Sequence, residues 1–246
     1  MSDALSARQI KILKLLIDEY IETAEPVGSE ALDKKYNLGV SPATIRNEMA
    51  SLIKSGFLKQ IHTSSGRVPT PKAMKLYIDQ LMEEKQMSLA EEVKAKEEVG
   101  KGKGDVDRMM EEATHALARQ TGSLALAAVD SYDKIWHAGY HNIFSNPEFA
   151  DMILCESLFS MIDEAERIND ILFHRMDPSS ILDVMFGDEL SWPNLSPVSI
   201  VSTHFNIYGK KGALGVVGPT RLSYPRIVPV LKYFGSIIEE ATKKYE

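Results

Sequence analysis

The sequence predicts an α+β protein with a helical N-terminal domain and a second domain built on a sheet. Three observations support this prediction. Residues 6–56 repeat apolar side chains at helical spacing, interrupted by capping residues and turns. A strand–turn–strand pattern follows at 57–69. Several short apolar runs, flanked at both ends by helical segments, occupy the rest of the 246 residues.

The N-terminal stretch predicts three short helices. Residues 6–22 have an apolar stripe at spacings of three and four, which is typical of an amphipathic helix. A second helix is expected at 29–36 and a third at 42–55. Ser41 is the expected N-cap of the third helix, and Gly56 is expected to end it. A tight turn before the third helix is the pattern of a helix-turn-helix.

A predicted β-hairpin follows the third helix. Residues 57–62 and 67–69 read as its strands, and we expect Arg67 near its tip. Helix-turn-helix followed by a basic hairpin is the outline of a winged helix-turn-helix, in which the hairpin is the wing and the third helix enters a DNA groove. The alternative is a small three-helix domain without a nucleic-acid role.

Candidate DNA-binding residues of the third helix lie opposite its predicted buried stripe. They are Ser41, Ala43, Thr44, Arg46, Asn47 and Lys54. Arginine can pair bidentately with guanine and asparagine with adenine, so Arg46 and Asn47 are the candidates for base contacts. The alternative for Arg46 is a surface ion pair with Glu48 or Glu30. At the wing, the candidate phosphate or minor-groove donors are His62, Thr63, Ser64 and Arg67.

Charge is unevenly distributed along the chain. The formal net charge is −7, which by itself disfavours nucleic-acid binding. Residues 1–80 nevertheless hold 11 basic and 9 acidic side chains, whereas the remainder holds 17 basic and 26 acidic ones. Attraction to phosphate depends on the local field, so a slightly basic module on an acidic body is compatible with specific DNA binding.

The sequence predicts a domain boundary in a charged region. A further helix is expected at 71–99, and its second half is rich in Glu and Lys. We therefore expect a DNA-binding domain at 1–82, a charged linker at 83–104 and a second domain at 105–246. In the second domain, strands are predicted at 123–129, 134–140, 171–175, 181–186, 198–208 and 213–217, with long helices from Pro147 to Ile168 and from Pro225 onward.

Several functional classes find little support in the sequence. The single cysteine, Cys155, forms neither an internal disulfide nor a thiolate cluster and is expected in the core. No metal-ligand spacing and no nucleophile–base pair stands out, so we expect no cofactor and no enzymatic activity. The absence of a signal core or a long apolar run predicts a cytoplasmic protein. Arg221 is a candidate either for anion binding or for anchoring the C-terminal helix.

Five segments together resemble the HrcA family of heat-inducible transcription repressors. They are residues 26–29 (PVGS), 41–49 (SPATIRNEM), 62–70 (HTSSGRVPT), 146–149 (NPEF) and 215–224 (GVVGPTRLSY). The three N-terminal segments in this order are specific, whereas any one of them alone would be weak. The resemblance reaches both predicted domains.

The resemblance implies a homodimeric repressor of chaperone operons. It implies binding to a CIRCE-type inverted repeat of double-stranded DNA, a GAF-like second domain, and maintenance of the active form by the GroE chaperonin. Family members usually insert a dimerising subdomain, but only about 20 residues separate the 123–129 strand from Pro147, so this insertion is expected to be reduced or missing. The alternatives are a regulator whose GAF-like domain senses a small molecule, and an enzyme or scaffold with an incidental helix-turn-helix.

Overall fold

The computed structural model describes residues 5–62, 66–130, 132–175 and 181–243. The chain divides into two compact units, Met1–Glu83 and Glu84–Glu246. No helix within these ranges combines the length and the apolar character needed to cross a bilayer. Together the units contain helices and a five-stranded antiparallel sheet, which confirms the α+β class.

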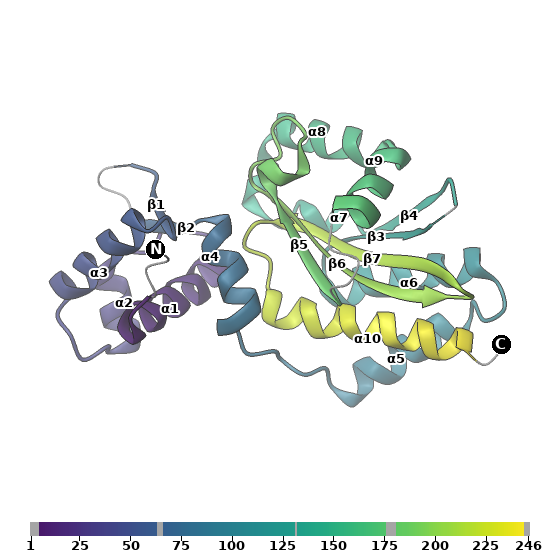
Figure 1. Cartoon of the computed structure of the whole chain (residues 1–246), viewed down its shortest axis with the longest axis horizontal. Coiled ribbons are helices and arrows are strands. Elements are labelled where there is room, and N and C mark those ends of the chain that lie inside the picture. The colour runs from purple at the N-terminus through teal and green to yellow at the C-terminus, as the bar shows by residue number, and fades with distance from the viewer. Residues whose placement is uncertain (1–4, 63–65, 131, 176–180, 244–246) are drawn as a thin grey trace. The chain divides into compact units, whose positions relative to one another are not determined.

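The first unit begins with three helices and a short hairpin (Figure 1). These elements are α1 (Ala7–Thr23), α2 (Ser29–Tyr36), α3 (Pro42–Lys54), β1 (Leu58–Gln60) and β2 (Arg67–Pro69). Ser6 caps α1 in a capping box with Gln9. Leu16, Leu32 and Ile45, one from each helix, are fully buried. The three amphipathic faces therefore share one small core, as the apolar spacing predicts.

The region predicted as a single helix at 71–99 is interrupted. It starts with α4 (Pro71–Leu76), continues through a π-helical turn (Tyr77–Leu81), and leaves helical geometry at Met82, whose backbone is extended. A new helix, α5 (Leu89–Gly100), begins only after Ser88. The physical reason is a capping box, because Ser88 and Glu91 satisfy each other's backbone N–H groups and so define a helix start.

The second unit is a five-stranded sheet between helices. Its strands are β3 (Leu124–Val129), β4 (Ile135–Ala138), β5 (Leu182–Phe186), β6 (Val198–Ile207) and β7 (Lys210–Pro219), in the order β4-β3-β7-β6-β5. Every neighbouring pair is antiparallel. The helices after α5 are α6 (Val106–Thr121), α7 (Tyr140–Ile143), α8 (Met152–Asp163), α9 (Ala165–Asn169) and α10 (Tyr224–Lys243), with shorter helical turns at Pro147–Ala150, Asp170–Arg175 and Gly187–Leu190.

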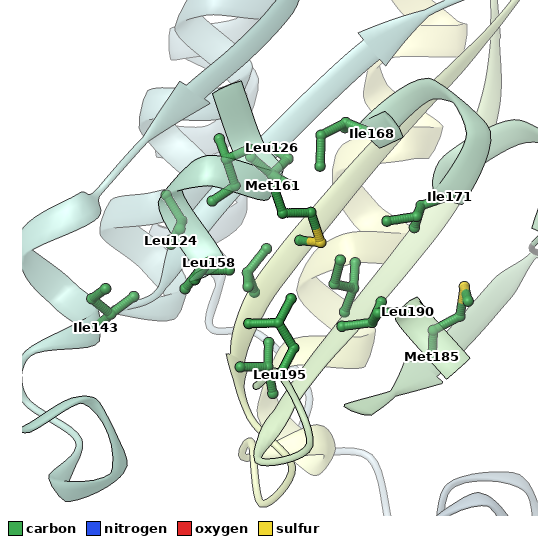
Figure 2. Packing of buried hydrophobic residues seen from close by; sticks show 14 of the residues in the cluster. Leu124, Leu126, Ile143, Leu158, Met161, Ile168, Ile171, Met185, Leu190 and Leu195 are labelled. Atoms are coloured by element: carbon green, nitrogen blue, oxygen red, sulfur yellow. The ribbon is translucent and has the colours of Figure 1, made fainter. Parts of the chain in front are cut away.

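Helices cover both faces of this sheet, which explains its nearly continuous apolar strands. In β3, Leu124 and Leu126 join a core with α7, α8 and α9, whereas α6 and α10 contact the sheet from its other face. Figure 2 shows Leu158 and Met161 of α8 meeting Leu126 in this core. All six residues of β3 are buried, as expected for a strand that faces protein on both sides.

Two further expectations differ from the structure. The strand predicted at 171–175 is a π-helical turn that continues α9, and its Ile171 and Leu172 are buried in the same core. Short apolar runs do not distinguish a strand from a buried helical segment. The charged residues expected to form a linker at 83–104 contain α5, which packs against α6 and α10 through Ala95 and Val99.

Candidate nucleic-acid interface

The start of α3 is fixed by its own side chains. Ser41 is the N-cap, and its hydroxyl accepts a hydrogen bond from the Thr44 backbone N–H at 3.2 Å. The Ser41 and Thr44 hydroxyls also lie 3.0 Å apart within hydrogen-bonding distance. Pro42 takes the first helical position, where its missing N–H costs nothing. Two of the predicted site residues thus hold the helix end in place.

The face of α3 opposite its core is a solvent-exposed stripe. Ile45, Met49 and Leu52 are buried. The exposed residues of the helix include Ala43, Arg46, Asn47, Ala50 and Lys54. Their spacing of three, four, seven and eleven from Ala43 places them on one side of a helix. We call these five residues the exposed stripe of α3; it contains four of the six residues predicted for this helix.

Arg46 extends from the exposed stripe into solvent. Its side chain is 65% exposed, and within the described part of the chain it forms one loose ion pair, with Glu30 at 3.9 Å. The sequence alternative of a Glu30 pair is therefore present but weak, because exposed pairs at this distance contribute little. Because this pair is weak, the Arg46 guanidinium can contact another group at little cost in free energy.

Glu48, the one acidic residue within α3, pairs with a cation from α1. The Arg8 Nε donates to its Oε1 at 2.6 Å, and the Glu48 side chain is mostly buried. The alternative in which Arg46 pairs with Glu48 is therefore not realised, because the Glu48 carboxylate pairs with Arg8. Helix α1 contacts α3, and none of the five residues of the stripe carries a carboxylate.

The candidate DNA-binding residues predicted for the hairpin differ in their exposure and position. His62 is exposed just beyond β1. Thr63 and Ser64 lie outside the described residues. Arg67 is half-buried and begins β2, where its N–H and C=O exchange hydrogen bonds with Val27 at 2.8 and 2.9 Å. Arg67 lies opposite Gln60, in the ladder pair nearest to the turn, so it is at the end of the hairpin where it was expected, and its bridge to Val27 also ties it to the segment before α2.

One exposed cation of the hairpin was not among the predicted residues. Lys59 lies in β1 between buried Leu58 and exposed Gln60 and pairs across the hairpin with Val68. Alternation along a two-residue period would have indicated that Lys59 faces solvent when Leu58 faces the core.

The hairpin is fastened to the end of α3. Gly56 ends the helix with a φ of +76°, a conformation that favours glycine. The Thr70 hydroxyl donates to the Gly56 carbonyl at 2.7 Å, and the Lys72 ammonium donates to the Ser55 carbonyl at 2.9 Å. Lys72 also lies 4.2 Å from the Phe57 ring centroid. These contacts hold helix and hairpin in a fixed relation.

Arg221, the candidate for anion binding in the second unit, already forms an ion pair with Glu148. Its Nε donates to Glu148 Oε1 at 2.7 Å and its Nη2 donates to Glu148 Oε2 at 2.8 Å, with Asn146 Oδ1 at 3.4 Å. This bidentate pair joins the NPEF segment to the turn before α10. The structure favours the anchoring role over anion binding. Among the described residues, no group of three potential metal ligands lies together.

Comparison with known proteins identifies the family. The family described as HrcA protein C terminal domain matches residues 66–228. The heat-inducible transcription repressor HrcA of Clostridium acetobutylicum is 27% identical, and the alignment covers 92% of this chain and 94% of that protein. The protein of the same name from Desulforamulus reducens is 28% identical, with 92% and 94% coverage.

These alignments also show that this chain is a shortened form. The first alignment extends over 328 positions, whereas 92% of a 246-residue chain supplies only about 226 of them. About a hundred positions of that relative therefore have no counterpart here, which confirms the expected shortening.

A crystal structure of a hypothetical protein, solved at 2.2 Å resolution, has the same fold. It superposes with a TM-score of 0.76 at 17% identity and covers 99% of this chain and 100% of that one. At this identity the likeness concerns the fold alone. The family match spans more than half of the sequence, and full-length relatives align over nearly all of it, so this chain belongs to the HrcA family.

Proposed function

We propose that this protein is a transcription repressor that binds a specific DNA operator through the exposed stripe of α3 and the hairpin β1–β2. The observation that carries the proposal is the stripe itself, a guanidinium, an amide and an ammonium on one face of a helix whose other face is buried. The names of its relatives, heat-inducible transcription repressors, support the same role.

In this proposal the first unit is a winged helix-turn-helix and α3 is its recognition helix. Arg46 and Asn47 lie in its first two turns, the part that reaches base edges in the major groove. Arg46 is assigned to a guanine and Asn47 to an adenine. Lys54, at the far end of the helix, and His62, in the hairpin, are assigned to phosphates.

The operator is proposed to be a CIRCE-type inverted repeat bound by a homodimer. Two copies of α3 read two half-sites on one face of a duplex, so the symmetry of the DNA follows the symmetry of the protein. The family resemblance supports chaperone operons as targets, a GAF-like second unit, and the GroE chaperonin as the partner that maintains activity. Retention of the protein by immobilised chaperonin tests this last assignment.

The central test is a titration of labelled DNA followed by fluorescence anisotropy. Selection from a random pool first gives the half-site sequence and spacing. Arg46→Ala is then expected to weaken operator binding by about 1–3 kcal/mol, or roughly 5- to 150-fold, and to relax preference at one base position. Arg108→Ala is the matched control, because it removes another exposed arginine, from α6 of the second unit.

The dependence of DNA affinity on salt concentration and on base sequence distinguishes base-specific binding from non-specific attraction to phosphates. Lys54→Ala is expected to weaken all sequences alike and to reduce the dependence of affinity on salt concentration by about one unit of slope. Equal operator affinity of wild type and Arg46→Ala would remove the assignment of Arg46. Failure to enrich any sequence from the pool would contradict the proposed function as a whole.

A further inference from the structure

Two exposed aliphatic side chains begin an apolar strip on the outer face of α5. Leu89 is 76% exposed and Val93 is 49% exposed, although both are large hydrophobic residues. They are four positions apart and therefore neighbours on one helix face, and Lys96 and Gly100 continue the same line. The buried residues of α5, Ala95, Glu98 and Val99, lie on other faces of the helix.

This strip runs into a groove between α5 and α10. The two helices contact each other and lie side by side below the sheet in Figure 1. The groove has a volume of about 200 Å³, and it is lined by Val99, Gly100, Ile237 and Ala241, with Lys96 and Glu240 among its polar residues. Together with Leu89 and Val93, these residues form what we call the α5–α10 surface.

The charges of the α5–α10 surface include both signs. Lys96 and Glu240 pair with each other at 3.1 Å, and their side chains are 60% and 57% exposed. Lys94 and Glu97 are also exposed on α5. A surface that carries an apolar strip flanked by both signs can meet a copy of itself across a two-fold axis, with lysines opposite glutamates.

The position of α5 in the chain also suits pairing with a second copy. It is the first element of the second unit, and Leu89 follows Glu83, the last residue of the first unit, by six residues. Six extended residues span at most about 20 Å. Pairing at α5 would therefore join the two copies at the element that follows each first unit most closely in the chain.

We propose that the α5–α10 surface is the interface through which two copies of this chain form the homodimer. The proposal rests on the proposed function in one respect, that the operator is read by two copies. It assigns the contact to Leu89 and Val93, packed against the groove of the partner copy. Burial of these two side chains supplies the apolar centre of the interface, and the surrounding charges form its rim.

The test compares two equally exposed apolar residues in the full-length protein. Leu89→Glu is expected to raise the dimer dissociation constant at least about thirty-fold in sedimentation equilibrium. Met152→Glu, at a residue of α8 that is also 76% exposed, is expected to leave it unchanged. Circular dichroism shows whether each variant keeps its fold. Dissociation by Met152→Glu and not by Leu89→Glu would overturn the proposal, and so would a monomeric wild type.

A second measurement does not depend on how the charged variants fold. Leu89→Cys is expected to give a covalently cross-linked dimer with a bismaleimide, and Met152→Cys is expected to give none, since native Cys155 is buried. DNA binding distinguishes this proposal from the previous one. Leu89→Glu should bind a half-site as wild type does and lose affinity only for the full repeat, whereas Arg46→Ala weakens both. Unchanged binding of Leu89→Glu to the full repeat would contradict the interface.

Discussion

Removal of the Arg221 side chain tests how strongly the second unit depends on one ion pair. Arg221 precedes α10 and binds Glu148 with two hydrogen bonds of 2.7 and 2.8 Å. The two side chains are 10% and 22% exposed. Glu148 belongs to the helical turn Pro147–Ala150, so this contact links the α7–α8 layer to the end of β7. In Arg221→Ala the Glu148 carboxylate would keep its partly buried place without a cation.

The magnitude follows from this partial burial. Removing one partner of a fully buried pair costs about 3–5 kcal/mol, whereas an exposed pair is worth at most about 1 kcal/mol. Water can reach Glu148 in part, so we expect the free energy of unfolding to fall by about 2–3 kcal/mol. For a unit of this size, that corresponds to a decrease in Tm of about 5–10 °C.

Tryptophan fluorescence reports this unit selectively. The chain has two tryptophans, Trp136 and Trp192, and both lie in Glu84–Glu246. Urea unfolding followed by their emission therefore isolates its transition. Arg226→Ala serves as the control, because Arg226 meets Glu91 at 3.8 Å with both side chains well exposed, and a loss below about 0.5 kcal/mol is expected. A loss for Arg221→Ala no larger than that of the control would refute the reasoning.

Two further changes test local features of the same unit. Gly139→Ala is expected to destabilise it by about 2–4 kcal/mol in urea unfolding, because Gly139 has a φ of +86° and an added Cβ would lie 2.6 Å from the Ser123 carbonyl oxygen; Gly100→Ala, where nothing lies within 4 Å, should not destabilise it. The Lys134 ammonium, by hydrogen bonding, lowers the pKa of Asp107, so the stabilisation from this pair is present above the ordinary aspartate pKa and is lost as the pH falls through the lowered one. Lys134→Met should raise the Asp107 pKa toward its ordinary value in an NMR titration, and an unchanged pKa would contradict the assignment.

Local sequence signals predicted the N-terminal elements closely. The cap at Ser41, the proline at the first turn and the glycine end of α3 are short-range features, and each has a direct backbone consequence. The exposed stripe followed from helical spacing alone. Strands β3 and β6 were also predicted, from apolar runs bounded by turn residues.

Predictions failed where distant residues decide the outcome. The pairing of Glu48 with Arg8 joins residues 40 positions apart, and the backbone bridge between Val27 and Arg67 likewise had no local signal. The π-helical turn at 170–175 follows from burial of Ile171 against the sheet and not from its local pattern. The Ser88–Glu91 capping box is visible in the sequence, but the run of charged residues around it favoured the prediction of one continuous, solvated helix.

The shortening of the chain constrains where two copies can meet. About a hundred positions of a full-length relative are absent, yet the five strands still form one antiparallel sheet in the order β4-β3-β7-β6-β5, and helices still cover both of its faces. The segments that resemble the family are also retained, and two of them meet in the Arg221–Glu148 pair. The missing positions are therefore dispensable for this fold. If a dimer is needed to read an inverted repeat, its contact must come from a surface that the shortened chain keeps, and the exposed Leu89 and Val93 on α5 provide one that follows the first unit closely in sequence.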